Sequence, residues 1–260
     1  MQKTIYYDSF ADDLVRSSEQ DIALPADYKF IRRGFWNTLA DRFALLCVRV
    51  FGFFYVRLCL GVRFYGRHRL WRYRRAGYFL YANHTQAVAD PFITALACVG
   101  ARPYGIVSTA NFGIPVIGRL MPWLGALPVI PTLQGRQSLA EAVGEHIERH
   151  HPVAIYPEAH VWNYYTHIRP FSAAAFGYPT DTQVPCFAMT TVYRRPLWGK
   201  RPRIEVYIDG PFYAEIGLPA REQRQRLCAT IRHALEMRAA QSNYEYVRYE
   251  QRTNNQSVKS

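Results

Sequence analysis

The sequence predicts an α/β fold, a largely parallel mixed sheet flanked by helices, with an N-terminal membrane-associated helical segment. From residue 77 onward, short apolar runs alternate with segments of helical spacing, which is typical of a parallel sheet covered by helices. The chain has 260 residues, 49% of them hydrophobic, which is enough for one sizeable core. We expect an N-terminal segment over residues 1–76 and one α/β domain over residues 77–260.

The most apolar part of the N-terminal segment is residues 35–62, and the stretch RFYGRHRLWRYRR follows at 63–75. Arg49 and Arg57 interrupt the apolar part, so it lacks the run of about 20 uncharged residues that a membrane-spanning helix needs. We expect one interfacial helix or a helical hairpin, with its arginines directed toward lipid phosphates. The alternative is a buried helix that covers the core of the following domain.

Six segments of the second part have the composition of strands, because each is short, rich in β-branched and aromatic residues, and bounded by Gly, Pro or polar residues. They are residues 77–83, 102–109, 125–130, 151–157, 184–193 and 203–210. The helices predicted between and after them cover residues 90–99, 113–123, 135–150 and 219–240. Functional residues of such folds lie at the carboxyl ends of strands, where His84 and the stretch YPEAH (156–160) both fall.

The net charge of +12 and a pI near 9.6 favour an anionic partner: nucleic acid, anionic lipid or a phosphorylated substrate. The five cysteines include no C-x-x-C pair and their number is odd, which suits a reducing compartment better than a disulfide framework. The N-terminus lacks the pattern of a secretory signal. We therefore expect a peripheral or monotopic protein on the cytoplasmic face of the cell membrane.

The stretch YANHTQAVADPF, residues 81–92, places a histidine and an aspartate between a strand and a helix. Asp90 before Pro91 is typical of a helix N-cap and first helical position. A carboxylate has two oxygens, so one can cap the helix while the other accepts the N–H of the His84 ring. The second ring nitrogen is then free to act as a base.

This stretch resembles the first motif of the glycerolipid acyltransferases, in particular the bacterial 1-acylglycerol-3-phosphate acyltransferase-like enzymes. Further stretches resemble the second, third and fourth motifs of that family in the same order. They are GIPVIGRLMPWLGALPVI (113–130), AIYPEAH (154–160) and VPCFAM (184–189). The resemblance covers roughly residues 77–190, and the order of several weak motifs is more specific than any one of them.

The resemblance implies acyl transfer from a thioester, either acyl-CoA or acyl carrier protein, to the hydroxyl of a lysophospholipid such as lysophosphatidic acid. His84 would remove the hydroxyl proton and Asp90 would stabilise the imidazolium. The implied reaction needs neither a covalent acyl-enzyme nor a cofactor. Glu158, in the third motif, is a candidate to hold the acceptor or to organise the site, and Asn83 lies beside the catalytic histidine.

The chain departs from the family pattern at three places. Five residues separate His84 from Asp90, where the family has four. Ala159, His160 and Val161 follow the glutamate of the third motif, where the family has glycine, threonine and arginine, and Pro131 replaces the arginine that ends the second motif. The family's two arginines are associated with the acceptor phosphate, so the phosphate site is either rebuilt from Arg119, Arg136, His160 or Arg169, or absent. The substrate-binding candidates are Asn83, Arg119, Arg136, Glu158, His160 and Arg169.

The sequence also contains histidines that could bind a metal ion. His146 and His150 share a helix face and, with His160 or His167, have the residue types of a metal site. The spacing is not H-E-x-x-H, and the helix dipole favours histidines near a C-terminus, so no metal is expected.

The arginines and aromatic residues after position 62 are also typical of single-stranded nucleic-acid grooves. Their place directly after the apolar stretch favours a lipid surface, so no nucleic acid is expected. Two alternatives stay open: an acyltransferase for a non-phosphorylated acceptor, and a non-catalytic basic protein that binds membranes or nucleic acid.

Overall fold

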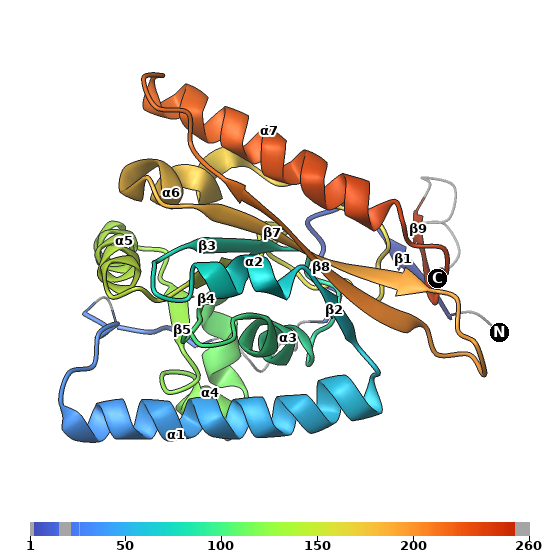
Figure 1. The fold of residues 1–260 in the computed structure, drawn as a ribbon, viewed down its shortest axis with the longest axis horizontal. Helices are drawn as coiled ribbons and strands as arrows, with labels where there is room; N and C mark the ends of the chain where they lie inside the picture. Colours follow the sequence, from blue (N-terminus) through green and yellow to red (C-terminus); the bar gives the residue numbers. More distant parts are fainter. Residues whose placement is uncertain (1–2, 16–21, 26, 253–260) are drawn as a thin grey trace.

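The computed structural model describes residues 3–15, 22–25 and 27–252, and a seven-stranded sheet forms its centre (Figure 1). The strands follow the spatial order β2-β8-β7-β3-β6-β4-β5. All neighbouring strands are parallel except β7 and β8, which are antiparallel. Their bounds are β2 (Arg63–Tyr65), β3 (Phe79–Ala82), β4 (Tyr104–Ser108), β5 (Ala126–Val129), β6 (Val153–Ile155), β7 (Cys186–Arg194) and β8 (Arg203–Phe212). The predicted fold class, a largely parallel mixed sheet, is confirmed.

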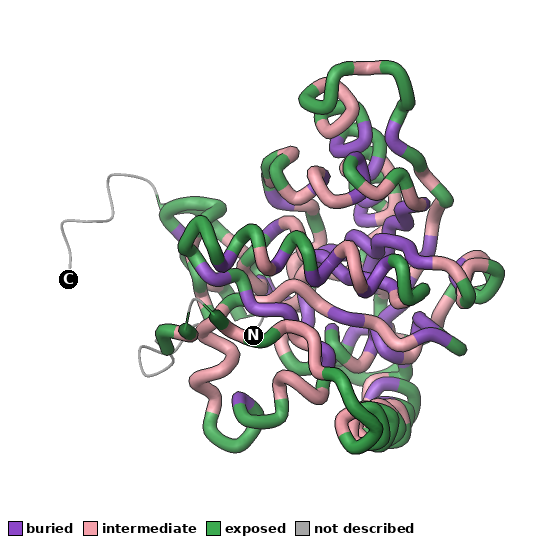
Figure 2. Tube along the Cα trace, turned by 90° about the vertical axis from the view of Figure 1, so that its left-hand side faces the viewer, coloured by how far each residue is buried: buried purple, intermediate pink, exposed green. Residues whose placement is uncertain are grey.

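Helices cover both faces of this sheet (Figure 1). The α-helices are α1 (Phe35–Gly52), α2 (Arg67–Arg72), α3 (Asp90–Ala97), α4 (Ile117–Leu120), α5 (Leu133–Glu148), α6 (Gly177–Thr182) and α7 (Ala220–Ala239). The π-helix η2 (Phe53–Cys59) continues α1, and the 3-10 helices are η3 (Thr109–Gly113) and η4 (Ala173–Phe176). Buried residues gather in the middle of the molecule between these layers (Figure 2).

The central strand β3 explains why the sequence FLYA is apolar throughout. Successive side chains of a strand point to opposite faces, and here both faces are covered. Leu80 and Ala82 belong to a core with residues of η2, α2 and α3. Phe79 and Tyr81 belong to a second core with residues of α5 and α7. The strand is therefore buried on both faces, and the loop that follows it starts from a rigid position.

All six predicted strands are present, with shifted ends, and the four predicted helices correspond to α3, α4, α5 and α7. The segment 113–123 contains only the four-residue α4, since Pro115 and Pro122 flank it and proline does not continue a helix. Helix α5 begins at Leu133, earlier than predicted, because the hydroxyl of Thr132 accepts a hydrogen bond from the backbone N–H of Gly135 and caps it.

The N-terminal segment contributes strands that the sequence did not predict. β1 (Lys3–Tyr7) pairs in parallel with β9 (Val247–Gln251) in a second, two-stranded sheet. β2 is an edge strand of the main sheet, beside β8. Segments on both sides of residue 76 thus share both sheets, and the domain division at that residue stays a prediction.

Helix α1 and η2 form one continuous helical run along the outside of the molecule (Figure 1). The run packs on α3, where Arg49 donates hydrogen bonds to the carbonyls of Ala95, Cys98 and Ala101. Among the residues described above, no helix has the length and apolar character required to cross a membrane.

Candidate active site

The loop between β3 and α3 brings the two predicted catalytic residues together. Nδ1 of His84 lies 2.7 Å from Oδ2 of Asp90, and the same carboxylate oxygen accepts a 3.0 Å hydrogen bond from the backbone N–H of Gln86. The side chain of Asp90 is 2% exposed and that of His84 is 22% exposed. The five-residue spacing keeps the contact because the carboxylate turns back toward the loop that precedes its helix.

The predicted capping role of Asp90 is wrong. Ala89 is the N-cap of α3, Asp90 is its first residue, and no side chain caps this helix. The carboxylate binds the N–H of Gln86, which precedes the helix, so both its bonds hold the loop and the imidazole. The contact with His84 is present, and its catalytic role stays a prediction.

The rest of the loop is fixed by buried hydrogen bonds. The hydroxyl of Tyr193, from β7, lies 2.9 Å from both Oγ1 of Thr85 and Nε2 of Gln86. The carbonyl of Thr85 accepts a bond from the backbone N–H of Tyr164. A loop held at so many points keeps the His84 side chain in a fixed position. Such pre-organisation is what general acid–base catalysis requires.

Tyr156 was not predicted as part of the site, although it lies within the strand-end stretch YPEAH. Its ring is 4.5 Å from the ring of His84, and its hydroxyl donates a 3.1 Å bond to the carbonyl of Asp90. The hydroxyl also lies 2.7 Å from Oγ1 of Thr94. Tyr156 therefore supports one side of the imidazole and leaves its edge free.

The contact with Asp90 assigns a proton to Nδ1 of His84. An ionised carboxylate only accepts hydrogen bonds, so the 2.7 Å contact assigns the donor to His84. Burial raises the pKa of Asp90, while the bonds from His84 and from the backbone of the loop offset part of that rise. Within the described residues, no protein atom binds Nε2 of His84, which is thus available to a substrate hydroxyl.

Glu158 follows the carboxyl end of the neighbouring strand β6 and binds the backbone of the same loop. Its Oε2 accepts a 3.1 Å bond from the backbone N–H of His84, and its Oε1 accepts a 2.8 Å bond from the backbone N–H of Arg169. The side chains of Glu158 and Arg169 form an ion pair at 3.4 Å, and each is 1% exposed. Burial raises the pKa of Glu158, and the charge of Arg169 offsets part of that rise.

The guanidinium of Arg169 is held by the protein on several sides. It donates to the carbonyls of Phe10 and His160 and lies 4.8 Å from the centre of the Trp162 ring. A buried cation with these partners supports the loop and the N-terminal segment that covers it. It is not exposed to receive a headgroup.

Asn83 is also engaged within the protein. Its Nδ2 donates to the carbonyl of Thr191 at 3.1 Å, and its Oδ1 accepts from the N–H of Thr191 at 2.8 Å. These bonds extend the pairing of β3 with β7 beyond the last residue of the strand. The side chain fixes the start of the loop that carries His84.

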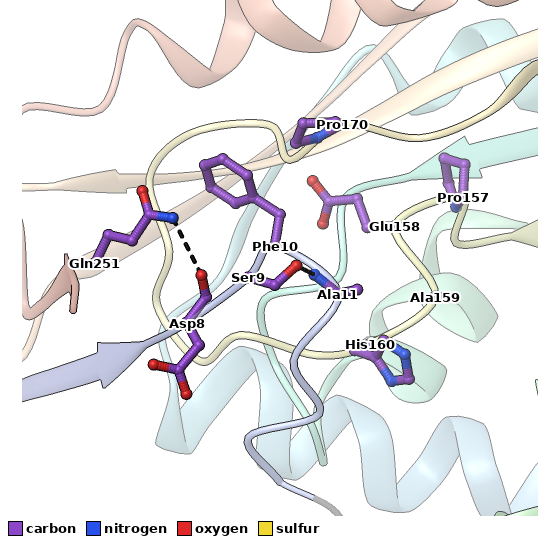
Figure 3. A pocket seen from close by; sticks show the side chains of 10 residues that line it. All are labelled: Asp8, Ser9, Phe10, Ala11, Pro157, Glu158, Ala159, His160, Pro170 and Gln251. Atoms are coloured by element: carbon purple, nitrogen blue, oxygen red, sulfur yellow. Dashed lines mark hydrogen bonds between the residues drawn. The ribbon is translucent and has the colours of Figure 1, made fainter. Parts of the chain in front are cut away.

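His160 lines a cavity of about 540 Å³ on the far side of Glu158 (Figure 3). Its Nδ1 lies 3.2 Å from Oδ2 of Asp13. The cavity is open to solvent and lies between the turn after β1, the loop after β6 and the end of β9. Its lining residues are Asp8, Ser9, Phe10, Ala11, Pro157, Glu158, Ala159, His160, Pro170 and Gln251. Two carboxylates among them disfavour an anionic headgroup in this cavity.

Arg119 and Arg136 are both exposed, and no ion pair of either is found within the described part of the chain. Arg119 lies on α4, which follows β4, and Arg136 lies in the first turn of α5, which follows β5. Since β3, β6, β4 and β5 are parallel neighbours, Arg136 lies at the sheet edge that carries His84. Helix α4 leads from that edge back to the start of β5, where the carbonyl of Met121 accepts a bond from the N–H of Ala126.

Two of the histidines considered as metal ligands, His146 and His150, lie at the end of α5, away from the loop of His84. His146 is buried at the end of α5, its ring 3.6 Å from that of Tyr104, and its Nδ1 lies 3.4 Å from Nδ1 of His151. Burial lowers the pKa of His146 to about 3. No cluster of three or more potential metal ligands occurs in the described ranges.

Ala159 occupies a left-handed backbone conformation, with φ of 64°, where the resembling family has glycine. We expect Ala159→Gly to raise the free energy of unfolding by about 1 kcal/mol, because the strain on Cβ exceeds the entropy cost of glycine. Urea unfolding measures this. The control Ala140→Gly, at an exposed position inside α5, is expected to lower it by about 1 kcal/mol. Equal losses in both variants would refute the strain at Ala159.

Both the sequence and the fold are similar to those of known proteins. The sequence model of the family described as Acyltransferase matches residues 61–192. The fold is similar to the crystal structure of the 1-acyl-sn-glycerophosphate (LPA) acyltransferase PlsC from Thermotoga maritima. The TM-score is 0.57 at 16% sequence identity, and the similarity covers 83% of this chain and 87% of that one. No curated protein matches the sequence significantly.

Proposed function

The chain belongs to the Acyltransferase family, and on this premise we propose that it moves a fatty acyl group from an acyl thioester to the hydroxyl of a lysophospholipid, 1-acylglycerol 3-phosphate. The observation that carries the proposal is the 2.7 Å contact between Nδ1 of His84 and Asp90, which leaves Nε2 without a partner among the described residues, on a side chain that is partly exposed. The donor is acyl-CoA or acyl carrier protein.

In the proposed reaction, Nε2 of His84 takes the proton of the acceptor hydroxyl as its oxygen attacks the thioester carbonyl. A bond forms between that oxygen and the carbonyl carbon, and Asp90 stabilises the imidazolium. The C–S bond then breaks, the imidazolium returns the proton to the leaving thiolate, and the products are an ester and a free thiol. General base catalysis of this kind contributes about 10² to 10⁴ in rate. Thiol release that depends on both acyl-CoA and lysophosphatidic acid tests the reaction.

The phosphate of the acceptor is assigned to Arg119 and Arg136. Both are exposed cations, Arg136 directly after the carboxyl end of β5 and Arg119 on α4 between β4 and β5. Arg169, in contrast, is buried and bound to Glu158 and to backbone carbonyls. An acidic headgroup needs such cations to offset its charge as it leaves water.

We expect Arg119→Gln/Arg136→Gln to raise the KM for lysophosphatidic acid by about tenfold to a hundredfold, since a contact to a charged group contributes about 1.5 to 3 kcal/mol. Steady-state kinetics with lysophosphatidic acid and with monoacylglycerol measure the effect. The dephosphorylated acceptor and the control Arg221→Gln, exposed on α7, are expected to show no change. Equal losses with both acceptors would indicate an acceptor without phosphate.

Membrane association is assigned to the outer face of α1 and η2. Apolar side chains recur there at helical spacing and are exposed, which is the reverse of a helix that buries its apolar face in a core. They are Trp36, Leu39, Phe43, Leu46, Val50, Phe54 and Leu58. Such a helix binds in the plane of a membrane interface. This supports a peripheral or monotopic enzyme, which we place on the cytoplasmic face of the membrane.

We expect Trp36→Asn/Phe43→Asn to lower partition into anionic phospholipid vesicles by at least about tenfold, since burial of one large apolar side chain contributes about 1.5 to 3 kcal/mol. Vesicle sedimentation measures the partition. The matched control is Leu197→Asn/Trp198→Asn, which removes two exposed apolar residues from the connection between β7 and β8. Equal losses in both double variants would contradict a specific role of α1.

A further inference from the structure

The distribution of charge in the first third of the chain is one-sided. Residues 42–89 contain nine arginines and no aspartate or glutamate. The positive charge of this segment therefore has no acidic partner within the segment itself. Arg57 and Arg67 both lie beside the short strand β2, because Nη1 of Arg57 binds the carbonyl of Val62 and the guanidinium of Arg67 lies over the ring of Phe64.

Two of these arginines are fixed by backbone carbonyls. Arg49 donates to the carbonyls of Cys98 and Ala101, which follow α3, so the negative end of that helix offsets its charge. Arg57, in η2, donates through Nη1 to the carbonyl of Val62, and the residue is exposed to solvent. One-turn π segments of this kind occur often at functional sites.

Arg67 is the unsatisfied member of the cluster. Its guanidinium lies 5.1 Å from the centre of the Phe64 ring, and its Nε is buried without any hydrogen-bond partner. It makes no ion pair to any residue that the structure describes. Burial lowers the pKa of Arg67, and the charges of Arg57 and Arg49 lower it further. A half-buried cation beside two others is costly unless an anion joins them.

From this arrangement we infer that Arg57 and Arg67 form a second anion site, which binds a phosphate group. Three features favour a phosphate: the fork-shaped donors of two arginines, the unpartnered Nε of Arg67, and the absence of acidic residues from residues 42–89. The exposed Phe54 and Leu58 on the same helix as Arg57 favour an anionic phospholipid headgroup as its source. That choice of source rests on the proposed membrane association, whereas the phosphate site itself does not.

Calorimetric titration of the full-length protein tests the site, with dihexanoyl phosphatidic acid below its micelle concentration, coenzyme A and inorganic phosphate as probes. All proteins carry Arg119→Gln/Arg136→Gln, so that the proposed acceptor site does not contribute. We expect Arg57→Gln/Arg67→Gln to weaken binding of the lipid by about tenfold or more. The control Arg42→Gln/Arg75→Gln removes two exposed arginines of the same segment, and we expect it to change binding less than twofold.

A loss confined to the lipid supports a headgroup site, and a loss that extends to coenzyme A or inorganic phosphate supports a phosphate site filled from solution. Equal weakening in the two double variants, or no binding of any probe, would overturn the inference. His84→Ala is expected to bind the probes like the parent protein, so a failed catalytic proposal and a failed phosphate site give different results.

Discussion

The variant His84→Ala is expected to lower the rate of acyl transfer by at least about 10² to 10⁴. The reason is that Nε2 of His84 is the proposed base, and in the described part of the chain no other titratable side chain binds the carboxylate of Asp90. The side chain is 22% exposed and sits in a polar loop, so its removal costs little packing. We expect the melting temperature to stay close to that of the wild type.

The control for this variant is His233→Ala, which removes an exposed histidine from α7, on the other side of the sheet. It is expected to retain full activity. If His84→Ala kept more than about a tenth of the activity, the general-base role would be wrong. If it unfolded, the loop would depend on the imidazole in a way that its hydrogen bonds do not indicate.

The variant Arg169→Gln is expected to lower the free energy of unfolding by about 3 to 5 kcal/mol. The substitution leaves Glu158 buried without its counter-charge, which is the costly way to break a buried ion pair. It also removes the bonds that tie the loop to Phe10 and His160. Thermal and urea unfolding measure the loss, and activity is expected to fall because Glu158 holds the backbone N–H of His84.

The double variant Glu158→Gln/Arg169→Gln distinguishes this structural role from substrate binding. We expect it to be more stable than Arg169→Gln alone, because no unpaired charge is then left in the core. A stable Arg169→Gln protein with a defect only toward phosphorylated acceptors would show instead that Arg169 binds the headgroup.

The parts of the fold that could be predicted are those whose burial pattern is local. The sequence FLYA of β3 is apolar because both faces are covered, and its end marks the place of His84. The pairing of β1 with β9 could not be predicted, since the two strands come from opposite ends of the chain. Both are half exposed and short, so neither has a strong pattern of its own.

The candidate site was predictable to the level of the motif and no further. The contact of His84 with Asp90 followed from the family resemblance, although the rotation of the carboxylate into the loop did not, because an N-cap and this arrangement have the same sequence. Arg169 was expected at the acceptor because it is a cation downstream of Glu158. Its burial depends on the loop after β6 folding back under the N-terminal segment, which no local pattern specifies.

The most direct test of the account is mass spectrometry of the products formed by the purified protein. The protein is incubated with acyl-CoA or acyl carrier protein and a mixture of lysophosphatidic acid and monoacylglycerol, alongside His84→Ala. If His84 is the base of an acyl transfer to lysophosphatidic acid, the wild type forms phosphatidic acid and one equivalent of free thiol per acyl group transferred, and His84→Ala forms neither. Phosphatidic acid formed equally by both proteins, or free fatty acid as the only acyl product, would contradict it.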